Sequence, residues 1–157
     1  MLPSIYIETS IVSYLVARPS RDALMAERQR QTREWWANHR GGYTLFTSEI
    51  VVREAGRGDV SMARDRLVAL FGIPVLPTGP EIRALTNSLV ARGPLPRKAE
   101  TDAAQIALAA FARLDFLLTW NCRHIANPRM YPTIVRVCRE WGFTPPVLCT
   151  PDELLRR

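Results

Sequence analysis

The stretch SIYIETSIVSYL, residues 4 to 15, decides the fold prediction for this chain. Residues 4 to 7 have the apolar, β-branched and aromatic composition of a short buried strand, and residues 11 to 15 begin an apolar helix. Glu8 stands between them, where the chain must turn. A carboxylate at the end of a core strand is costly to desolvate unless it is paired, hydrogen-bonded or bound to a metal. Glu8 is therefore the first candidate for a functional residue.

Further strands and helices alternate along the rest of the chain. Strands are expected at 4–8, 43–47, 73–76, 115–120 and 146–150, and helices at 10–17, 20–38, 48–56, 60–71, 80–92, 98–113, 130–141 and from 151 onward. Ser20 and Ser48 are the predicted N-caps of two helices, and Thr150 to Glu153 forms a predicted capping box. The strands are continuous apolar runs, which indicates a mostly parallel sheet of about five strands covered on both faces. In such sheets ligands bind beyond the carboxyl ends of the strands.

Length and composition predict one domain, residues 1–157, of a soluble globular protein. Hydrophobic residues make up 47% and charged residues 23% of the sequence. The first residues lack the pattern of a signal peptide, and no apolar run approaches the roughly 18 residues of a membrane span, so we expect a cytoplasmic protein. The three cysteines include no CxxC pair, which favours reduced structural thiols over a zinc site built from Cys122, His124 and Cys138.

The formal net charge of +6 and the pI near 9.9 favour a polyanionic partner such as RNA. The signal is weak because 20 of the 21 basic residues are Arg, a bias that genomic base composition also explains. The basic residues are scattered and form no tail.

Three of the 15 acids lack an obvious structural role. Glu8 ends a buried strand. Glu54 lies on the same helical stripe as the apolar Ile50, and Asp102 lies four residues before Ile106, at the edge of an apolar helix face. Taken singly, each acid has the alternative explanation of a pair with a buried Arg. Taken together with Asn121, which follows the strand ending in LLTW, they can reach one crevice at the carboxyl edge of the sheet.

Clustered carboxylates repel one another unless a cation compensates their charge. Mg²⁺ or Mn²⁺ prefers oxygen ligands of this kind, together with water and substrate phosphate, and can activate water toward a phosphodiester. The two histidines fall at a helix end (His39) and in a loop (His124), so they do not suggest a general acid and base pair, although His124 can neighbour the site.

Four stretches resemble the PIN domain, and specifically the ribonuclease toxins of the VapC type from toxin–antitoxin pairs. These stretches are IYIETSIVSYL, TSEIVVREAGRGD, ETDAAQIALAA and LLTWNCRHIAN, followed by PVLCTPDELL, and the resemblance covers almost the whole chain. It implies a PIN-like three-layer α/β sandwich. It also implies a Mg²⁺- or Mn²⁺-dependent endoribonuclease that is blocked by a cognate antitoxin and often forms a homodimer.

The resemblance carries the family's four site positions onto Glu8, Glu54, Asp102 and Asn121, as catalytic and metal-binding residues. It gives Thr9 and Thr119 the role of hydrogen-bonding the metal ligands. Two positions depart from the family pattern. The first acid is more commonly Asp, and Glu moves the carboxylate by about 1.5 Å, one bond length. The fourth position is Asn here, a neutral oxygen ligand or a group that orients a water molecule.

Three further expectations concern surfaces and rival functions. Arg123 and Arg53 are the candidates for contact with RNA phosphates. Trp35 and Trp36, near the end of the helix at 20–38, are expected to pack in the core rather than to form a dimer or antitoxin surface. The main rival function is a PIN-like module that binds RNA or protein without cutting. A haloacid-dehalogenase-type phosphatase or a receiver-like domain is disfavoured, because both need an Asp after the first strand and a well-placed Lys, whereas this chain has Glu8 and one Lys.

Overall fold

The structure is a computed structural model in which residues 1–156 are described. The elements follow one another as β1 (Ser4–Ile7), α1 (Thr9–Val16), α2 (Ala23–Asn38), η1 (Arg40–Gly42), β2 (Thr44–Phe46), α3 (Glu49–Ala55), α4 (Val60–Leu70), α5 (Pro80–Ala91), η2 (Arg97–Ala99), α6 (Glu100–Phe111), β3 (Phe116–Leu118), α7 (Tyr131–Glu140), β4 (Val147–Cys149) and α8 (Pro151–Leu155). Within the described residues, no helix has both the length and the apolar character that crossing a membrane requires.

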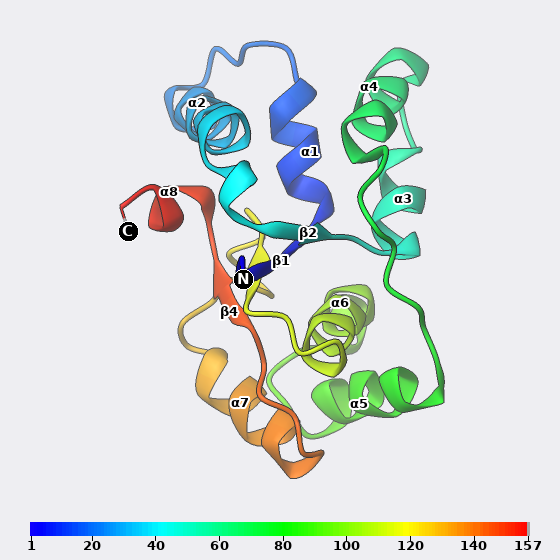
Figure 1. The fold of residues 1–157 in the computed structure, drawn as a ribbon. Coiled ribbons are helices and arrows are strands. Elements are labelled where there is room, and N and C mark those ends of the chain that lie inside the picture. The colour runs from blue at the N-terminus through cyan, green and yellow to red at the C-terminus, as the bar shows by residue number, and fades with distance from the viewer. Residues whose placement is uncertain (157) are drawn as a thin grey trace.

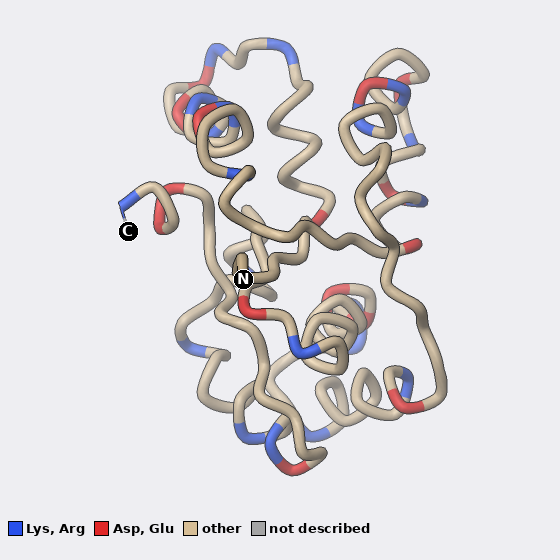
Figure 2. Tube along the Cα trace, in the orientation of Figure 1, with Lys and Arg blue, Asp and Glu red and all other residues tan. Residues whose placement is uncertain are grey.

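The strands form a parallel sheet with the order β2-β1-β3-β4. Helices α1 to α4 lie on one side of it and α5 to α7 on the other, which confirms the expected α/β fold with a parallel sheet flanked by helices (Figure 1). Ile5, Tyr6 and Ile7 of the central strand are fully buried, as expected for a strand covered on both faces. Basic and acidic residues are spread over the helices of both layers (Figure 2).

The sheet has four strands in the described part of the chain, so the expected fifth strand at 73–76 is wrong. This segment makes only an isolated parallel bridge between Thr47 and Val75. The Thr47 N–H donates to Pro74 O at 2.9 Å, and the Leu76 N–H donates to Thr47 O at 2.8 Å. Pro74 lacks the N–H group that a longer ladder needs, so the pairing stops after one bridge.

The predicted helix ends are mostly confirmed. Ser48 caps α3, and Thr150 forms the capping box of α8 with Glu153. The start of α2 was placed too early, because its N-cap is Asp22 and not Ser20. Asp22 accepts a hydrogen bond from the Met25 N–H at 2.9 Å, whereas the Ser20 hydroxyl accepts one from the Asp22 N–H in the turn before the helix.

The predicted core tryptophans and cysteines also have defined positions. Trp35 is fully buried and Trp36 packs against the core, which confirms the core assignment of both side chains. Cys122 and Cys138 are free thiols, and Cys138 and Cys149 are buried, whereas Cys122 is exposed.

The strand order places a topological switch point at β1. The chain leaves β1 for β2 on one side, and β3 is added on the other side of β1. Ligand-binding crevices of open parallel sheets lie outside the carboxyl ends of the strands at such a point. Here that edge carries Glu8, immediately after β1, and the segment from Thr119 to Asn121, immediately after β3.

Candidate active site

Glu8 is buried, with 6% of its surface exposed, and caps the first turn of α1. Its Oε1 accepts hydrogen bonds from the Ser10 N–H at 3.2 Å, from the Ser10 hydroxyl and from Thr119 Oγ1 at 2.6 Å. Its Oε2 accepts no hydrogen bond from a described residue, and the ion pairs of the described residues all join other side chains. The alternative of a buried Arg partner therefore does not apply to Glu8 in the described part of the chain.

The pKa of Glu8 is raised above its ordinary value. Desolvation by burial is the main cause, and the nearby Glu54 carboxylate adds to the rise. The hydrogen bonds from Ser10 and Thr119 act in the opposite direction because they stabilise the ionised form. Glu8 is thus a carboxylate whose charge the protein alone compensates poorly.

Glu54 reaches this edge of the sheet from the last turn of α3. Its side chain is half-buried, and its Oε1 accepts a hydrogen bond from Thr9 Oγ1 at 2.8 Å. Thr9 follows Glu8 directly in the chain, so one residue of the β1–α1 turn holds the second acid beside the first. The predicted supporting hydroxyl of Thr9 therefore contacts Glu54, and that of Thr119 contacts Glu8.

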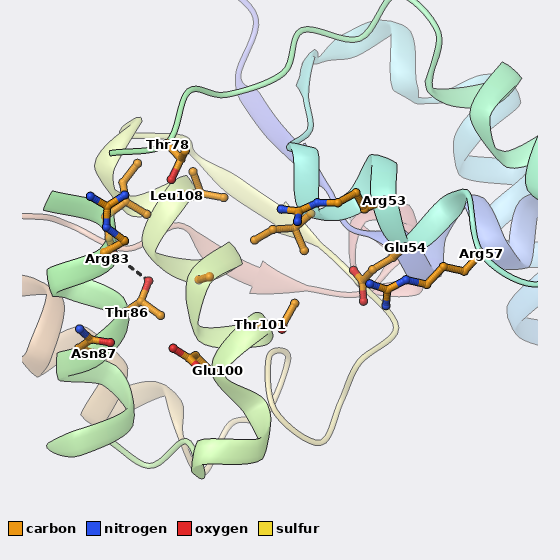
Figure 3. Close-up of a pocket in the computed structure, with 13 residues that line it drawn as sticks. Arg53, Glu54, Arg57, Thr78, Arg83, Thr86, Asn87, Glu100, Thr101 and Leu108 are labelled. Carbon is orange, nitrogen blue, oxygen red and sulfur yellow. Dashed lines mark hydrogen bonds between the residues drawn. The ribbon is translucent and has the colours of Figure 1, made fainter. Parts of the chain in front are cut away.

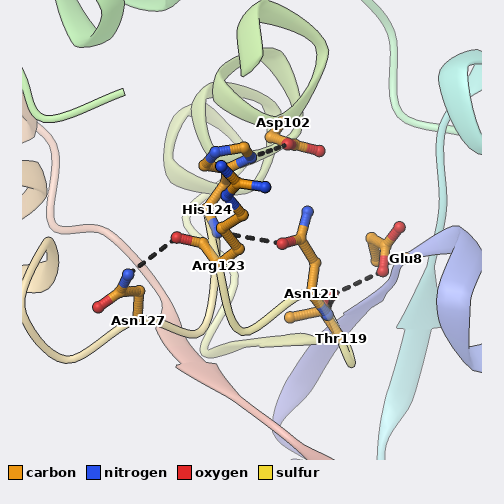
Figure 4. A network of polar contacts seen from close by, with 7 residues as sticks. All are labelled: Glu8, Asp102, Thr119, Asn121, Arg123, His124 and Asn127. Carbon is orange, nitrogen blue, oxygen red and sulfur yellow. Dashed lines mark hydrogen bonds and ion pairs between the residues drawn. The ribbon is translucent and has the colours of Figure 1, made fainter. Parts of the chain in front are cut away.

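Asp102 lies in the first turn of α6, beside the loop that follows β3. Its Oδ2 lies 3.2 Å from His124 Nδ1. The backbone N–H of His124 donates to Asn121 Oδ1 at 3.0 Å, so the carbonyl end of the Asn121 side-chain amide faces the backbone of its own loop. The Asn121 NH₂ group makes no hydrogen bond with a described residue and lies between Glu8 and Asp102 in Figure 4.

One network of hydrogen bonds connects the strand ends with α6. The Asn121 N–H donates at 2.9 Å to Thr119 Oγ1, which itself donates to Glu8. The network therefore runs from Glu8 through Thr119, Asn121 and His124 to Asp102 (Figure 4). The predicted Arg123 lies in the same loop but is exposed, and its guanidinium makes no ion pair with a described residue.

The four predicted site residues lie at one edge of the sheet without forming a closed cage. Among residues 1–156, no group of three or more His, Cys, Asp or Glu side chains is arranged closely enough to hold a metal ion by itself. The acids instead fall into two sets. Glu8 interacts electrostatically with Glu54, and Asp102 contacts His124. The predicted site residues thus share one edge of the sheet, but they do not form the single tight acidic cluster that the sequence led us to expect.

The carboxylates fit a hard divalent cation in one respect. Each acid uses one oxygen for hydrogen bonds, which are Oε1 of Glu8, Oε1 of Glu54 and Oδ2 of Asp102. The other oxygen of each has no hydrogen bond from a described residue. Mg²⁺ usually keeps several waters and is bound by one or two carboxylates plus substrate phosphates, rather than by an all-protein cage. An open arrangement with oriented carboxylates suits that mode of binding.

Sequence reasoning did not identify three supporting side chains. Ser10 donates to Glu8 and accepts the Trp120 N–H at 2.7 Å, which ties the two strand ends together. The buried Tyr6 hydroxyl donates to Gln105 Oε1 at 2.9 Å and lies 2.7 Å from Ser48 Oγ. The available signals were polar groups in apolar settings: a Gln on an Ala-rich helix face and a Tyr inside a core strand.

Comparisons with known proteins add no family assignment. A scan against models of known protein families finds no match for this chain, and a search of curated proteins finds no significant relative. The resemblance to PIN domains therefore stays a prediction from the sequence motifs.

Proposed function

We propose that this protein is a Mg²⁺- or Mn²⁺-dependent endoribonuclease. The observation that carries the proposal is the state of Glu8, a carboxylate that is almost fully buried, has no basic partner among the described residues and keeps one oxygen without a hydrogen bond. A buried charge of this kind costs stability unless a cation compensates it. The position of Glu8 at the switch point of the sheet, with three other polar site residues nearby, favours a bound metal as that cation.

The residues of the site have distinct roles in this proposal. Glu8, Glu54 and Asp102 hold the cation, directly or through water, with their unused carboxylate oxygens. Thr119 and His124 fix the orientation of Glu8 and Asp102 through hydrogen bonds to the other oxygens. A cation bound there supplies Lewis acidity toward a water molecule and the phosphodiester.

Asn121 takes the role of positioning a water molecule or a phosphate oxygen. Its Oδ1 is engaged by the His124 N–H, so the amide presents hydrogen-bond donors to the space between the acids. The NH₂ group of the amide is a hydrogen-bond donor and does not bind a cation. It can instead donate a hydrogen bond to a lone pair of a water or phosphate oxygen and so orient that oxygen.

The substrate and partner parts of the proposal have separate support. The net charge of +6 favours RNA as the polyanion. The role of a toxin with a cognate antitoxin, the homodimer and the cytoplasmic location rest on the resemblance and on the sequence expectations stated above.

The test is cleavage of RNA by purified protein with and without added Mn²⁺ or Mg²⁺. Asp102→Asn removes a carboxylate without changing the shape of the side chain, and we expect it to lower the rate by about 100-fold or more, at or beyond the upper end of effects seen for outer-shell groups of metal sites. Asp65→Asn, at an exposed position on α4, is the matched control and is expected to cleave like the wild type. Equal metal-dependent cleavage by Asp102→Asn and wild type would refute the site.

A PIN-like module that binds RNA or protein without cutting is the second candidate. It is favoured by the absence of a closed group of three metal-binding side chains among the described residues. In that case the wild-type protein binds RNA but does not cleave it at any concentration of Mn²⁺ or Mg²⁺, and Asp102→Asn binds RNA as the wild type does.

A further inference from the structure

A pocket of about 400 Å³ lies between α3, α5 and α6, next to the candidate active site. Its size falls in the range of about 300–1,000 Å³ that is usual for pockets that bind small molecules and cofactors. Glu54 lines the pocket and also belongs to the acid set beside Glu8, so the pocket and the active site share a wall (Figure 3).

Three arginines line this pocket: Arg53, Arg57 and Arg83. All three are exposed, and none of their guanidinium groups makes an ion pair or a hydrogen bond with a described residue. By contrast, arginines such as Arg30 and Arg92 are paired with acids. Arg53 lies on α3, Arg57 in the loop after α3 and Arg83 on α5, so unpaired guanidinium groups border the pocket on more than one side (Figure 3). An unpaired guanidinium can bind a phosphate through two parallel hydrogen bonds.

The pocket has an apolar floor and a polar rim. The floor is lined by Ile82, Ala104 and Leu108, of which Ile82 and Leu108 are buried. The rim includes the exposed Asn87 amide, which has no hydrogen-bond partner among the described residues. Apolar side chains with a free amide beside them suit an unstacked base, which is the form in which proteins recognise single-stranded RNA.

We propose that this pocket binds one nucleotide of a single-stranded RNA, next to the phosphodiester held at the acid site. Arg57 and Arg83 hold its phosphates, the apolar floor takes its base, and Asn87 contacts the edge of that base. The proposal rests on the proposed ribonuclease function for the position of the cut bond, but binding of RNA in the pocket is measurable without cleavage. The pocket would thereby decide which stretch of RNA reaches Glu54.

The experiment measures binding of a short fluorescein-labelled single-stranded RNA by fluorescence anisotropy. It is done in EDTA, so that no cleavage occurs, over a series of salt concentrations. Each phosphate contact to a single strand contributes a slope of about −0.7 to the plot of log affinity against log salt. We expect Arg57→Ala and Arg83→Ala each to weaken binding and to make the slope shallower by about 0.7.

Two further variants separate a binding effect from a folding defect. Thr78→Arg adds a cation at an exposed position that lines the pocket, and it is expected to tighten binding and to steepen the slope by about 0.7, a gain that a misfolded protein cannot give. Arg21→Ala removes an exposed, unpaired arginine from the loop before α2 and is the control, expected to change neither slope nor affinity beyond the small effect of one remote charge.

The outcomes distinguish the pocket from the catalytic proposal. If Arg83→Ala and Thr78→Arg leave the slope unchanged, or if the wild type does not bind RNA, the pocket is not an RNA site. If both variants shift the slope as expected and the wild type never cleaves RNA with added metal, the proposal of an RNA-binding pocket is supported and the proposal of a ribonuclease is refuted. If an oligoglutamate peptide displaces the RNA in an Arg83-dependent way and binds more tightly than the RNA does, the pocket is a site for an acidic protein partner and the proposal is overturned.

Discussion

The Glu8 side chain has two tasks that are usually given to different residues. Its Oε1 caps α1 through Ser10 and accepts a hydrogen bond from the Thr119 hydroxyl, and its Oε2 has no hydrogen bond from a described residue. Burial raises its pKa, so in metal-free protein the ionised form is disfavoured relative to an unfolded chain. The stability of the metal-free protein and its affinity for a cation are therefore linked through one carboxylate.

Replacing Glu8 by Gln should make the metal-free protein more stable at neutral pH. The Gln carbonyl can accept the same three hydrogen bonds without a buried charge. Since the folded pKa of Glu8 is raised, its contribution to stability is complete below the unfolded pKa and is lost as the pH rises through the folded pKa. We expect Glu8→Gln to lack this loss in urea denaturation series recorded in EDTA at increasing pH.

The control for this measurement is Asp65→Asn, whose carboxylate is exposed on α4 and which should follow the pH dependence of the wild type. A wild type that gains stability over Glu8→Gln as the pH rises would contradict the prediction, because it would mean that the folded protein favours the ionised form.

His124 is expected to act through Asp102 rather than on the substrate. Its ring nitrogen Nδ1 lies 3.2 Å from Asp102 Oδ2, so it holds this oxygen and leaves Oδ1 without a hydrogen bond from a described residue. Removal of such an outer partner typically lowers metal affinity or activity by about 10- to 100-fold. We expect His124→Ala to require more Mn²⁺ for half-maximal cleavage of RNA while its urea midpoint in EDTA stays close to that of the wild type. An unchanged metal requirement would show that His124 does not orient the ligand.

At the scale of elements, the three segments that carry the acids are joined below the site by a buried polar contact. Tyr6 of β1 lies between Ser48, the N-cap of α3, and Gln105 of α6. The Gln105 amide nitrogen is buried and has no hydrogen-bond partner among residues 1–156. The contact thus fixes α3 and α6 relative to β1, and it leaves the buried Gln105 amide nitrogen without a hydrogen bond to a described residue.

Tyr6→Phe should lower the free energy of unfolding by about 1–3 kcal/mol, because it leaves the buried Gln105 Oε1 without a donor. Gln105→Leu should cost less, since it also removes the unpartnered amide nitrogen. The double variant should then lose less stability than the sum of the two single variants. Urea denaturation of the four proteins closes this double-mutant cycle, and strict additivity would show that the two side chains are not coupled.

The elements also show which parts of the fold the sequence can predict. The apolar strand before Glu8 and the caps Ser48 and Thr150 are local signals, and the structure confirms them. The predicted strand at 73–76 is wrong, because Pro74 removes a donor from the ladder and only an isolated bridge forms.

The parts of the site that the sequence does not predict depend on long-range contacts. Tyr6 and Gln105 are 99 residues apart, and neither gives a local sign of the other. The orientation of the Asn121 amide depends on the loop that brings the His124 N–H to its carbonyl oxygen. The positions of Glu8 and Asn121 at one edge of the sheet were predictable from the strand ends, whereas the division of the acids into two sets was not.

For the whole molecule, a bound cation should appear as added stability. A ligand that binds only the folded protein stabilises it by about 2.7 kcal/mol at a concentration of 100 times its dissociation constant. We expect Mn²⁺ to raise the melting temperature of the wild type and of Asp65→Asn, and to raise that of Asp102→Asn much less. Thermal denaturation over a Mn²⁺ titration measures this, and equal shifts in all three proteins would exclude Asp102 from the binding site.

The central place of β1 has a consequence for the newly made chain. Glu8 is 111 residues away from Thr119, which supplies one of its hydrogen bonds, and β1 pairs with β3 at a similar separation. Pairing over such a distance is slow and cannot begin until both segments have left the ribosome. A translation product that stops before Phe116 therefore lacks β3 and Thr119, and the carboxyl edge that carries the candidate site is incomplete. Whatever chemistry the protein performs, that chemistry becomes possible only after the ribosome has made the segment from β3 to Asn121.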